Sequence, residues 1–424
     1  MKIIKTITLI AVVMLAGEAL SQDAEQVKRV VKKLSSEKYH GRAYTNNGAD
    51  KAAKYIQKEF KRAGLSDVGN WFQPFEFELG RIHTARLSVN DRELVPGAEF
   101  VARRNCPSIK GQFNVYYASP EVFASIEKMN QFLDRDLENC FVALDYDDLK
   151  HNRKSYDSTV NLLFKGKTDK FIMLQDAEIK DFVVYGRRKA NRVVVSIRKK
   201  AFPKNTGKLT IDLETSYGAV QAKNVLGWYG AASKTDSTII LCGHYDHLGE
   251  MGPDAWYPGA DDNALAIGSL IEIANYLTKN KVELNKNILF VAFSAEEAGL
   301  LGAKHFVANL PINKDHISYT INLDMIGFGN SGLYVWNGEA EKRIAGKLEA
   351  INNQKQLIDS LFIKENNPNS DHFPMVESGI PAVFITTGTK PSVHYHTVFD
   401  TFENTTFAKI EEIMKLVIEL VKQS

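Results

Sequence analysis

The chain has 424 residues, of which 44% are hydrophobic and 25% are charged, the ordinary balance of a globular protein. Its formal net charge of +2 at pH 7 argues against the strong positive field of a nucleic-acid-binding protein. The length is more than one core usually needs, which favours one large domain with a smaller one.

The N-terminal residues have the pattern of a secretory signal peptide. A basic start, "MKIIK", precedes the apolar run "TITLIAVVMLAG", and small residues follow at Ala19 and Ser21. The apolar run is shorter than the ~20 residues that a membrane-spanning helix needs, and no other stretch could span a membrane. We therefore expect residues 1–21 to be removed and the protein to be exported to the periplasm or the outside of the cell.

Three zones follow the predicted signal peptide. Residues 22–80 show two amphipathic helical patterns and then a strand, and they form the N-terminal part of the main domain. Residues 81–204 consist of short strand-like runs such as "NCFVALDY" and "NRVVVSI", which indicate a β-rich inserted module. Cys106 and Cys140 in this module are candidates for a disulfide, although the sequence does not show that they meet.

Strands and helices alternate from residue 205 to residue 424. The runs "STIILCGHYD", "KNILFVAFSA", "SYTINLDMIG" and "PAVFITT" are apolar strands, and helical patterns separate them. This alternation predicts an α/β fold, a three-layer α/β/α sandwich with a mostly parallel central sheet. In such sheets, ligands bind beyond the carboxyl ends of the strands.

Histidines and carboxylates stand at or just beyond those strand ends: His244 and Asp246, Glu296 and Glu297, Asp324, and His396. Two acidic positions here also have an ordinary structural explanation. Asp262 begins the helix after the first strand, where an aspartate can simply cap the helix. Ser294 with Glu297 fits a capping box. Asp324 is less easily explained in that way, because it interrupts an apolar strand and a buried carboxylate is costly unless it is paired or bound to a metal. The conjunction of these residues predicts a metal site at this edge of the sheet.

Six stretches, in this order, resemble the M28 family of zinc peptidases: "GHYDHLG", "PGADDNA", "FSAEEAGLLGA", "NLDMIG", "SDHFPMVESGIPAVF" and "HYHTVFDT". An earlier stretch, "KYHGRAYTNNGADKAAKYIQKEFKRAGL", resembles the segment that precedes such a domain. The insert at 81–204 weakly resembles the protease-associated domain that some members carry. The resemblance implies the phosphorylase/hydrolase-like α/β/α fold and a co-catalytic aminopeptidase with two zinc ions.

The resemblance also implies a set of metal ligands. His244 and Asp324 would bind one zinc ion, Glu297 and His396 would bind the other, and Asp262 would bridge the two. Two zinc ions ~3.5–4 Å apart polarise a scissile carbonyl and generate hydroxide at neutral pH. A nucleotide-hydrolase or serine-hydrolase function loses support, because the motifs of those classes are missing.

The remaining polar residues of these stretches receive other roles from the resemblance. Glu296 would be the general base, since the base must be a carboxylate that is not itself a ligand. Asp246 would orient His244. Tyr395 is a candidate donor to the oxyanion, with a simple packing role as the equal alternative. His247 is expected to line the loop, and His372 to lie near the pocket, without either one binding zinc.

The predicted protein is thus an exported zinc exopeptidase that removes N-terminal residues from peptides. A glutaminyl cyclase with one zinc ion and a carboxypeptidase are alternatives on the same fold. A binding module that has lost its metal is a further alternative, which the complete ligand set and Glu296 disfavour. The sequence leaves the oligomeric state open.

Overall fold

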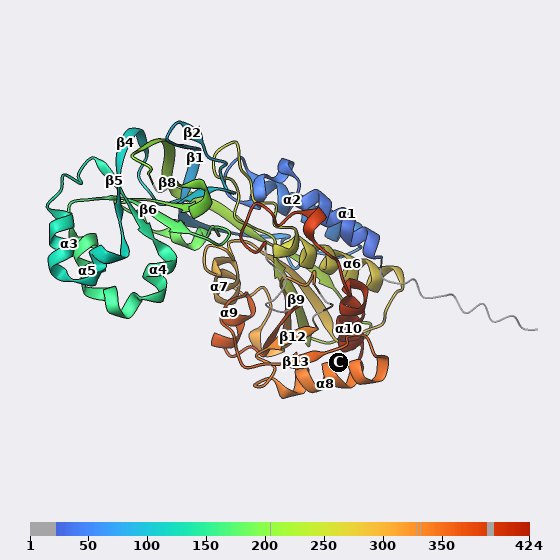
Figure 1. Cartoon of the computed structure of the whole chain (residues 1–424). Coiled ribbons are helices and arrows are strands. Elements are labelled where there is room, and N and C mark those ends of the chain that lie inside the picture. Colours follow the sequence, from blue (N-terminus) through green and yellow to red (C-terminus); the bar gives the residue numbers. More distant parts are fainter. Residues whose placement is uncertain (1–22, 204, 329, 331, 388–393) are drawn as a thin grey trace, which may run out of the picture.

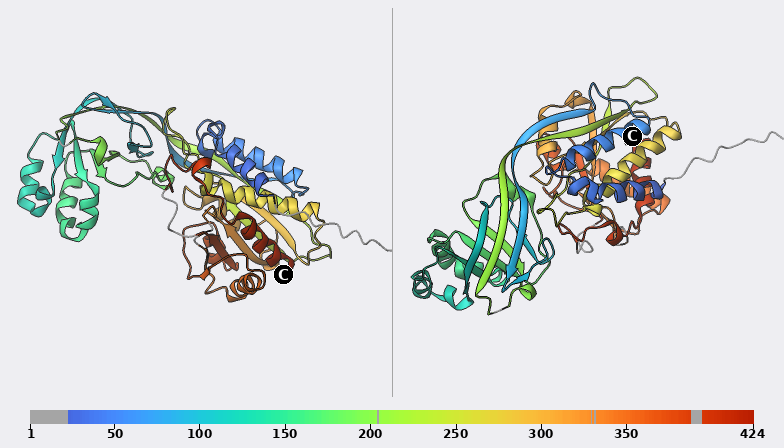
Figure 2. Two further views of the ribbon diagram at one scale, coloured as in Figure 1. Left: turned by 45° about the vertical axis from the view of Figure 1, so that its right-hand side comes forward. Right: turned by 90° about the horizontal axis from the view of Figure 1, so that it is seen from above.

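The computed structural model describes residues 23–203, 205–328, 330, 332–387 and 394–424, so the predicted signal peptide lies outside the described residues. The chain forms two lobes joined by a pair of long strands, and Figure 1 shows the smaller lobe, in teal and green, beside the larger one. The joining strands are β1 (Phe72–Val89) and β8 (Lys208–Tyr229). They pair antiparallel from Phe72 opposite Val225 to Val89 opposite Leu209, and Figure 2 shows them running from one lobe into the other.

The larger lobe is built on a mostly parallel sheet, as the sequence predicts. Its centre consists of four parallel strands, β9 (Thr238–His244), β10 (Asn287–Phe293), β11 (Ile317–Leu323) and β14 (Ala382–Thr386). On one side β12 (Leu333–Trp336) runs antiparallel to β14 and carries the edge strand β13 (Leu361–Ile363), and on the other side β8 runs antiparallel to β10. Every residue of β9, β10 and β14 is buried, which explains why these strands read as continuous apolar runs.

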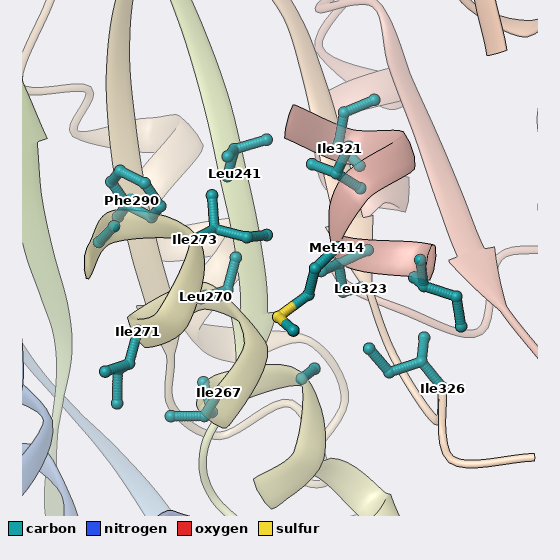
Figure 3. Close-up of a cluster of buried hydrophobic side chains, with 14 of the residues drawn as sticks. Leu241, Ile267, Leu270, Ile271, Ile273, Phe290, Ile321, Leu323, Ile326 and Met414 are labelled. Carbon is teal, nitrogen blue, oxygen red and sulfur yellow. The ribbon is translucent and has the colours of Figure 1, made fainter. Parts of the chain in front are cut away.

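Helices cover both faces of this sheet. One face is covered by α1 (Ala24–Leu34), α2 (Gly48–Arg62), α6 (Leu265–Lys279), α8 (Lys342–Lys355) and α10 (Ile410–Lys422), and the other by α7 (Leu301–Ala308) and α9 (His372–Glu377). Leu241 of β9 packs in the first layer with Leu270 of α6 and Met414 of α10 (Figure 3). Each fully buried aliphatic side chain of this kind contributes roughly 1.5–3 kcal/mol.

The smaller lobe continues the same sheet. Beyond β8 the strand order is β4 (Ile109–Ala118), β5 (Cys140–Asp145), β6 (Lys170–Gln175), β7 (Val193–Arg198) and β3 (Phe100–Ala102), while the short β2 (Arg92–Glu93) pairs with β1. The lobe also contains α3 (Ile126–Leu133), α4 (Tyr146–His151) and α5 (Arg153–Lys165). The sequence predicts that the insert begins at residue 81, which lies inside β1. No boundary falls there, because β1 runs on from the larger lobe into the smaller one.

Short helical turns complete the chain at Glu37–Arg42, Pro120–Ala124, Val183–Arg187, Lys199–Ala201, Ala260–Ala264, Lys314–His316 and Phe402–Asn404. Cys106, Cys140 and Cys242 are all buried and free, so the two candidate cysteines of the insert form no disulfide. Among the described helices, none has both the length and the apolar content required to cross a bilayer.

Candidate metal centre

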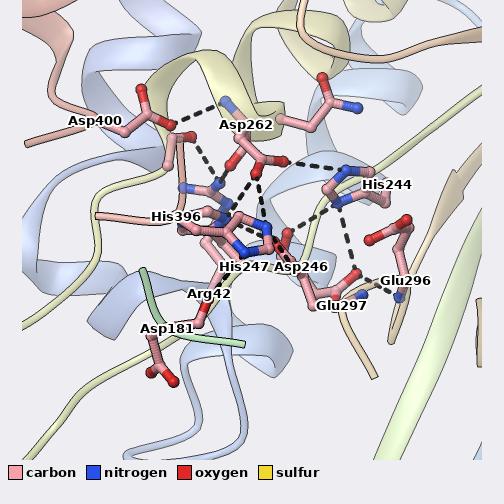
Figure 4. A network of polar contacts seen from close by, with 12 residues as sticks. Arg42, Asp181, His244, Asp246, His247, Asp262, Glu296, Glu297, His396 and Asp400 are labelled. Carbon is pink, nitrogen blue, oxygen red and sulfur yellow. Dashed lines mark hydrogen bonds and ion pairs between the residues drawn. The ribbon is translucent and has the colours of Figure 1, made fainter. Parts of the chain in front are cut away.

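The strand ends bring the predicted metal ligands to one edge of the sheet. His244 is the last residue of β9 and lies opposite Phe293 of the parallel strand β10. Glu297 follows β10 by four residues, and Asp324 follows β11 directly. His396 approaches from the loop between β14 and α10 (Figure 4). The neighbouring parallel strands thus deliver their polar ends to one place, as the sequence predicts.

Asp262 lies between two groups of side chains. Its Oδ1 atom is 3.3 Å from Nε2 of His244, and its Oδ2 atom is 3.4 Å from Nε2 of His396. Oδ1 of Asp324 is 3.4 Å from the same nitrogen of His244, and Oε2 of Glu297 is 3.1 Å from that of His396. The structure therefore brings all five predicted ligands together as two histidine–carboxylate groups that share one carboxylate.

The donor atoms of this cluster fit a zinc ion in each group. Imidazole nitrogens and carboxylate oxygens are both ordinary zinc ligands. All five side chains are buried, and Oδ2 of Asp262 and Oδ1 of Asp324 accept no well-formed hydrogen bond, although a histidine nitrogen lies 3.4 Å from each. Buried carboxylate oxygens without partners are costly, and a bound cation would remove that cost.

The two adjacent glutamates lie in different electrostatic environments. Burial alone would raise the pKa of Glu297, but the nearby His396 and His247 outweigh it and hold that pKa at about 2. Burial raises the pKa of Glu296 well above its usual range, with His244 opposing the shift and Glu297 adding to it. Glu296 belongs to neither histidine–carboxylate group and, unlike Glu297, lines the open cavity. The structure thus separates a carboxylate held among histidines from one that faces the substrate space.

A third histidine contacts the second group. Nδ1 of His247 is 3.0 Å from Oε1 of Glu297 and 3.8 Å from Oδ2 of Asp262, and its Nε2 atom is buried without a partner. These donor atoms of His247, Asp262 and Glu297 lie within 4.8 Å of one another. Sequence reasoning assigned His247 only to the loop lining, so its contact with Glu297 is a feature that it missed.

Asp246 is placed beside His244 but contacts it through the backbone. The Nδ1 atom of His244 is 3.1 Å from the carbonyl oxygen of Asp246, whereas the carboxylate of Asp246 is 3.9 Å away, too far for a hydrogen bond. That carboxylate instead accepts the backbone N–H groups of Glu296, at 3.1 Å, and Glu297, at 3.4 Å. Asp246 therefore positions the two glutamates as well as the histidine.

Arg42 holds the loop that carries Asp262. The side chain is fully buried and donates to four backbone carbonyls of this region, those of Tyr245, Pro258, Gly259 and Asp262. Burial lowers the pKa of Arg42 to about 10, and the surrounding acids, Asp400 foremost, oppose that shift. The guanidinium is therefore still charged at neutral pH. Arg42 lies within the resembling stretch "KYHGRAYTNNG", but nothing in that pattern assigned it a role.

Two further side chains fix the ligand carboxylates. The carboxylate of Asp400 accepts the backbone N–H groups of Asp261, at 2.9 Å, and Asp262, at 3.0 Å. The hydroxyl of Ser370 donates to Oδ2 of Asp324 at 2.7 Å. Gly259 has a φ of +60°, and a Cβ there would lie 2.4 Å from the carbonyl oxygen of Asp262, so the loop requires glycine at this position.

The smaller lobe supplies a direct contact to His396. The Nδ1 atom of His396 lies 2.9 Å from the carbonyl oxygen of Asp181, and the N–H of Asp181 donates to the carbonyl oxygen of His396 at 3.0 Å. The carboxylate of Asp181 forms a buried ion pair with Arg104, which also donates to the carbonyl oxygen of Glu250 at 3.1 Å. A hydrogen bond of this kind on the second ring nitrogen fixes the orientation of a metal-binding histidine.

The metal cluster opens into a cavity of about 280 Å³. Tyr395 lines this cavity, and its ring stacks on that of His396 with 3.8 Å between the ring centres. His372 is fully buried beside the cavity wall, with Nε2 3.0 Å from Oδ1 of Asn366, and it joins neither metal group. The wall is completed by the side chains of Lys180, Met325, Trp336, Asn367, Asn369, Phe384 and Thr386.

Residues 224–421 match the family model for peptidase family M28. This match spans just under half of the chain and supports an M28-type peptidase. Among curated relatives, aminopeptidase YwaD of Bacillus subtilis is 27% identical over 239 residues, which are 54% of this chain and 47% of that protein. The glutamate carboxypeptidase 2 homolog of Caenorhabditis elegans is 28% identical over 232 residues, 46% of this chain and 29% of that protein. The chain thus spans less than half the length of these two relatives.

The solved structure of BSAP, a zinc aminopeptidase from Bacillus subtilis, is similar to this chain over both lobes. The TM-score is 0.71 at 20% sequence identity, and the match covers 95% of each chain. The likeness establishes that the fold of the M28 domain and of the insert occurs in a solved protein.

Proposed function

We propose that this protein is a zinc-dependent exopeptidase that removes N-terminal residues from peptides with two zinc ions. The observation that carries the proposal is the position of Asp262, whose two oxygens face two separate histidine–carboxylate groups. One shared carboxylate between two such groups is the arrangement that a two-metal site requires. The names of YwaD and BSAP, an aminopeptidase and a zinc aminopeptidase, support the same conclusion.

In this mechanism the chain itself supplies the ligands, the base and the orientation of both. His244 and Asp324 would hold one zinc ion and Glu297 and His396 the other, and the ions would polarise the carbonyl and lower the pKa of the attacking water. Glu296 accepts a proton from that water and passes it to the leaving amine. The raised pKa of Glu296 suits this task, because it brings the carboxylate closer to the pH at which it must both gain and lose a proton.

The substrate's amino terminus would be held by carboxylates of the same cavity. A free α-amine is a cation at neutral pH, and Glu296 and Asp324 are, with Asp262, the acidic residues that line the cavity. Tyr395 remains a candidate donor to the oxyanion, since it lines the cavity next to His396. A carboxypeptidase is the second candidate, favoured by the similarity to the glutamate carboxypeptidase 2 homolog.

A panel of blocked and free peptides tests the reaction. We expect zinc-loaded protein to cleave Leu-Gly-Gly from its N-terminus, and to cleave the acetylated peptide far more slowly because acetylation removes the charge that the carboxylates hold. Equal cleavage of both peptides, or release of the C-terminal residue first, would identify an endopeptidase or a carboxypeptidase. Cyclisation of an N-terminal glutamine without hydrolysis would identify a glutaminyl cyclase.

We also propose that the protein is exported, on the basis of the signal-peptide pattern in residues 1–21. Mass spectrometry of the protein from its native host is expected to find an N-terminus at Gln22. An intact Met1 in the cytosolic fraction would contradict the proposal.

A further inference from the structure

Lys180 of the smaller lobe reaches the cavity that holds the metal cluster. It lies on the segment between β6 and the helical turn Val183–Arg187, and it lines the same cavity as Glu296 and His396. Of the lining residues that the structure describes, it is the only lysine or arginine. Its position is a feature of this chain's insert, outside the stretches that carry the family resemblance.

The ammonium group of Lys180 is held close to the reaction centre. Its Nζ atom lies 4.7 Å from the centre of the Tyr395 ring, which in turn stacks on His396 at 3.8 Å. Both distances are measured from the centre of the Tyr395 ring. The ammonium group therefore lies within about 10 Å of the centre of the His396 ring, roughly the length of three extended residues. The next residue, Asp181, donates its backbone N–H to the carbonyl oxygen of His396, and its own carbonyl oxygen contacts the Nδ1 atom of His396, which fixes the segment that carries Lys180.

The charge of Lys180 has no ion-pair partner within the described part of the chain. Glu178, whose charge acts on Lys180, lies with Oε2 3.6 Å from Nδ1 of His394, and the adjacent Asp181 pairs with Arg104. Partial burial lowers the pKa of Lys180, and the charge of Glu178 only opposes this shift. An ammonium group that has lost water and rests against an aromatic ring, with no carboxylate paired to it, favours the binding of an anion.

The cavity therefore offers opposite charges to the two ends of a short peptide. Glu296 and Asp324 suit the α-amine, whereas Lys180 would repel it. We propose that Lys180 binds a carboxylate of the peptide on the leaving-group side of the scissile bond, and that the protein prefers short peptides whose C-terminal carboxylate reaches it. This inference rests on the proposed peptidase function and adds a substrate class to it.

A peptide can offer Lys180 a carboxylate from two places, its C-terminus or an acidic side chain. Four substrates separate them: Leu-Ala, Leu-Ala-amide, Leu-Glu-amide and Leu-Gln-amide. For the zinc-loaded wild type we expect kcat/KM for Leu-Ala to exceed that for Leu-Ala-amide roughly 3- to 10-fold, the usual effect of one partly exposed charged contact. A preference confined to Leu-Glu-amide over Leu-Gln-amide would support the contact and make the acidic side chain its ligand.

Variants of Lys180 assign the preference to this residue. Lys180→Met is expected to bring the ratio of kcat/KM between acid and amide close to one, and Lys180→Arg to keep most of the preference because it keeps the charge. The matched control is Lys189→Met, which removes an exposed lysine of the same lobe and should leave the ratio as in the wild type. Added salt should reduce the wild-type ratio and have no effect on that of Lys180→Met.

Two results would overturn the inference, and neither resembles a failure of the proposed function. Wild-type protein that cleaves acids and amides equally, or a Lys180→Met variant that keeps the full preference, excludes the contact while peptidase activity persists. Leucyl-p-nitroanilide carries no carboxylate, so the absence of hydrolysis of this and of all four dipeptides would instead reject the peptidase function.

Discussion

Neighbouring residues of one loop have opposite electrostatic properties in this protein. Glu297 is surrounded by His396 and His247 at hydrogen-bonding distance, and its pKa is held at about 2. Glu296 has no such partner and faces the cavity, so burial raises its pKa. Because the same backbone segment presents both, anchored on Asp246, exchange of their roles would require the loop to be rebuilt.

This difference predicts distinct effects of two matched substitutions. Glu296→Gln keeps the shape but cannot accept a proton, so kcat should fall by ~10²–10⁴-fold with zinc content unchanged. Glu297→Gln removes a ligand charge and should lower zinc content. Kinetics and elemental analysis of both variants measure this, and the reverse pattern would show that the roles of the two residues are exchanged.

His247 and His396 both contact Glu297, and the structure distinguishes them by their other contacts. His396 reaches Asp262 at 3.4 Å and has its second nitrogen bonded to Asp181, whereas His247 is 3.8 Å from Asp262 and its second nitrogen has no partner. We expect His396→Ala to lose one of two zinc ions per chain after dialysis. His247→Ala should keep both with about 10- to 100-fold weaker affinity, as for residues that orient a ligand. Loss of an ion from His247→Ala alone would make His247 the ligand.

At the scale of elements, the segment between β6 and Val183–Arg187 ties the smaller lobe to the metal cluster. Arg104, beside β3, pairs with Asp181 in the interior and reaches Glu250 of the larger lobe. The pair thus lies where the two lobes and the predicted metal ligand His396 meet. A buried ion pair is costly to break because the remaining charge has no partner.

Arg104→Met is therefore expected to lower the free energy of unfolding by about 3–5 kcal/mol, since it leaves the buried carboxylate of Asp181 unpaired. The double variant Arg104→Met/Asp181→Asn removes that charge and should recover part of the loss. Urea unfolding of the two variants and the wild type measures the effect. A single variant as stable as the wild type would show that Asp181 is solvated or paired otherwise.

At the scale of the whole molecule, one sheet runs through both lobes and a large number of acids lie at its functional edge. Asp246, Asp261, Asp371 and Asp400 are buried there in addition to the predicted ligands. Burial raises the pKa of each of these four, because the charged forms lose water in a crowded acidic environment. The folded chain thus crowds carboxyl groups whose charged forms a pair of cations would stabilise.

Removal of metal should destabilise the entire protein for this reason. Chelation is expected to lower the unfolding temperature, and zinc should restore it in a concentration-dependent manner, because an ion that binds only the folded state stabilises it by mass action. Differential scanning calorimetry at several zinc concentrations tests this. An unfolding temperature that does not respond to zinc would contradict the assignment of the cluster as a metal centre.

The sequence predicts the parts of this protein that local patterns determine. The parallel strands are recognisable because they are buried on both faces, and their polar ends meet because parallel strands end at the same edge. The roles of Arg42, Ser370 and Asp181 depend on contacts with residues far along the chain. Arg42 donates to backbone carbonyls and Asp181 accepts with its own carbonyl, and contacts through backbone atoms leave no pattern in the sequence. The short helices of the smaller lobe, such as α4, have too few turns for a clear apolar period.

The bond between the carbonyl of Asp181 and His396 has a consequence for how such enzymes diversify. A part that only capped the cleft would be free to be exchanged between relatives or to be lost, with changes in selectivity alone. Here the carbonyl of Asp181 orients the imidazole of His396, a predicted metal ligand, so we expect that a transplanted insert must supply a backbone carbonyl at the same place. We therefore expect exchange of the insert between related proteins to be constrained at Asp181 and its neighbours, and less so at the distal helices of the insert.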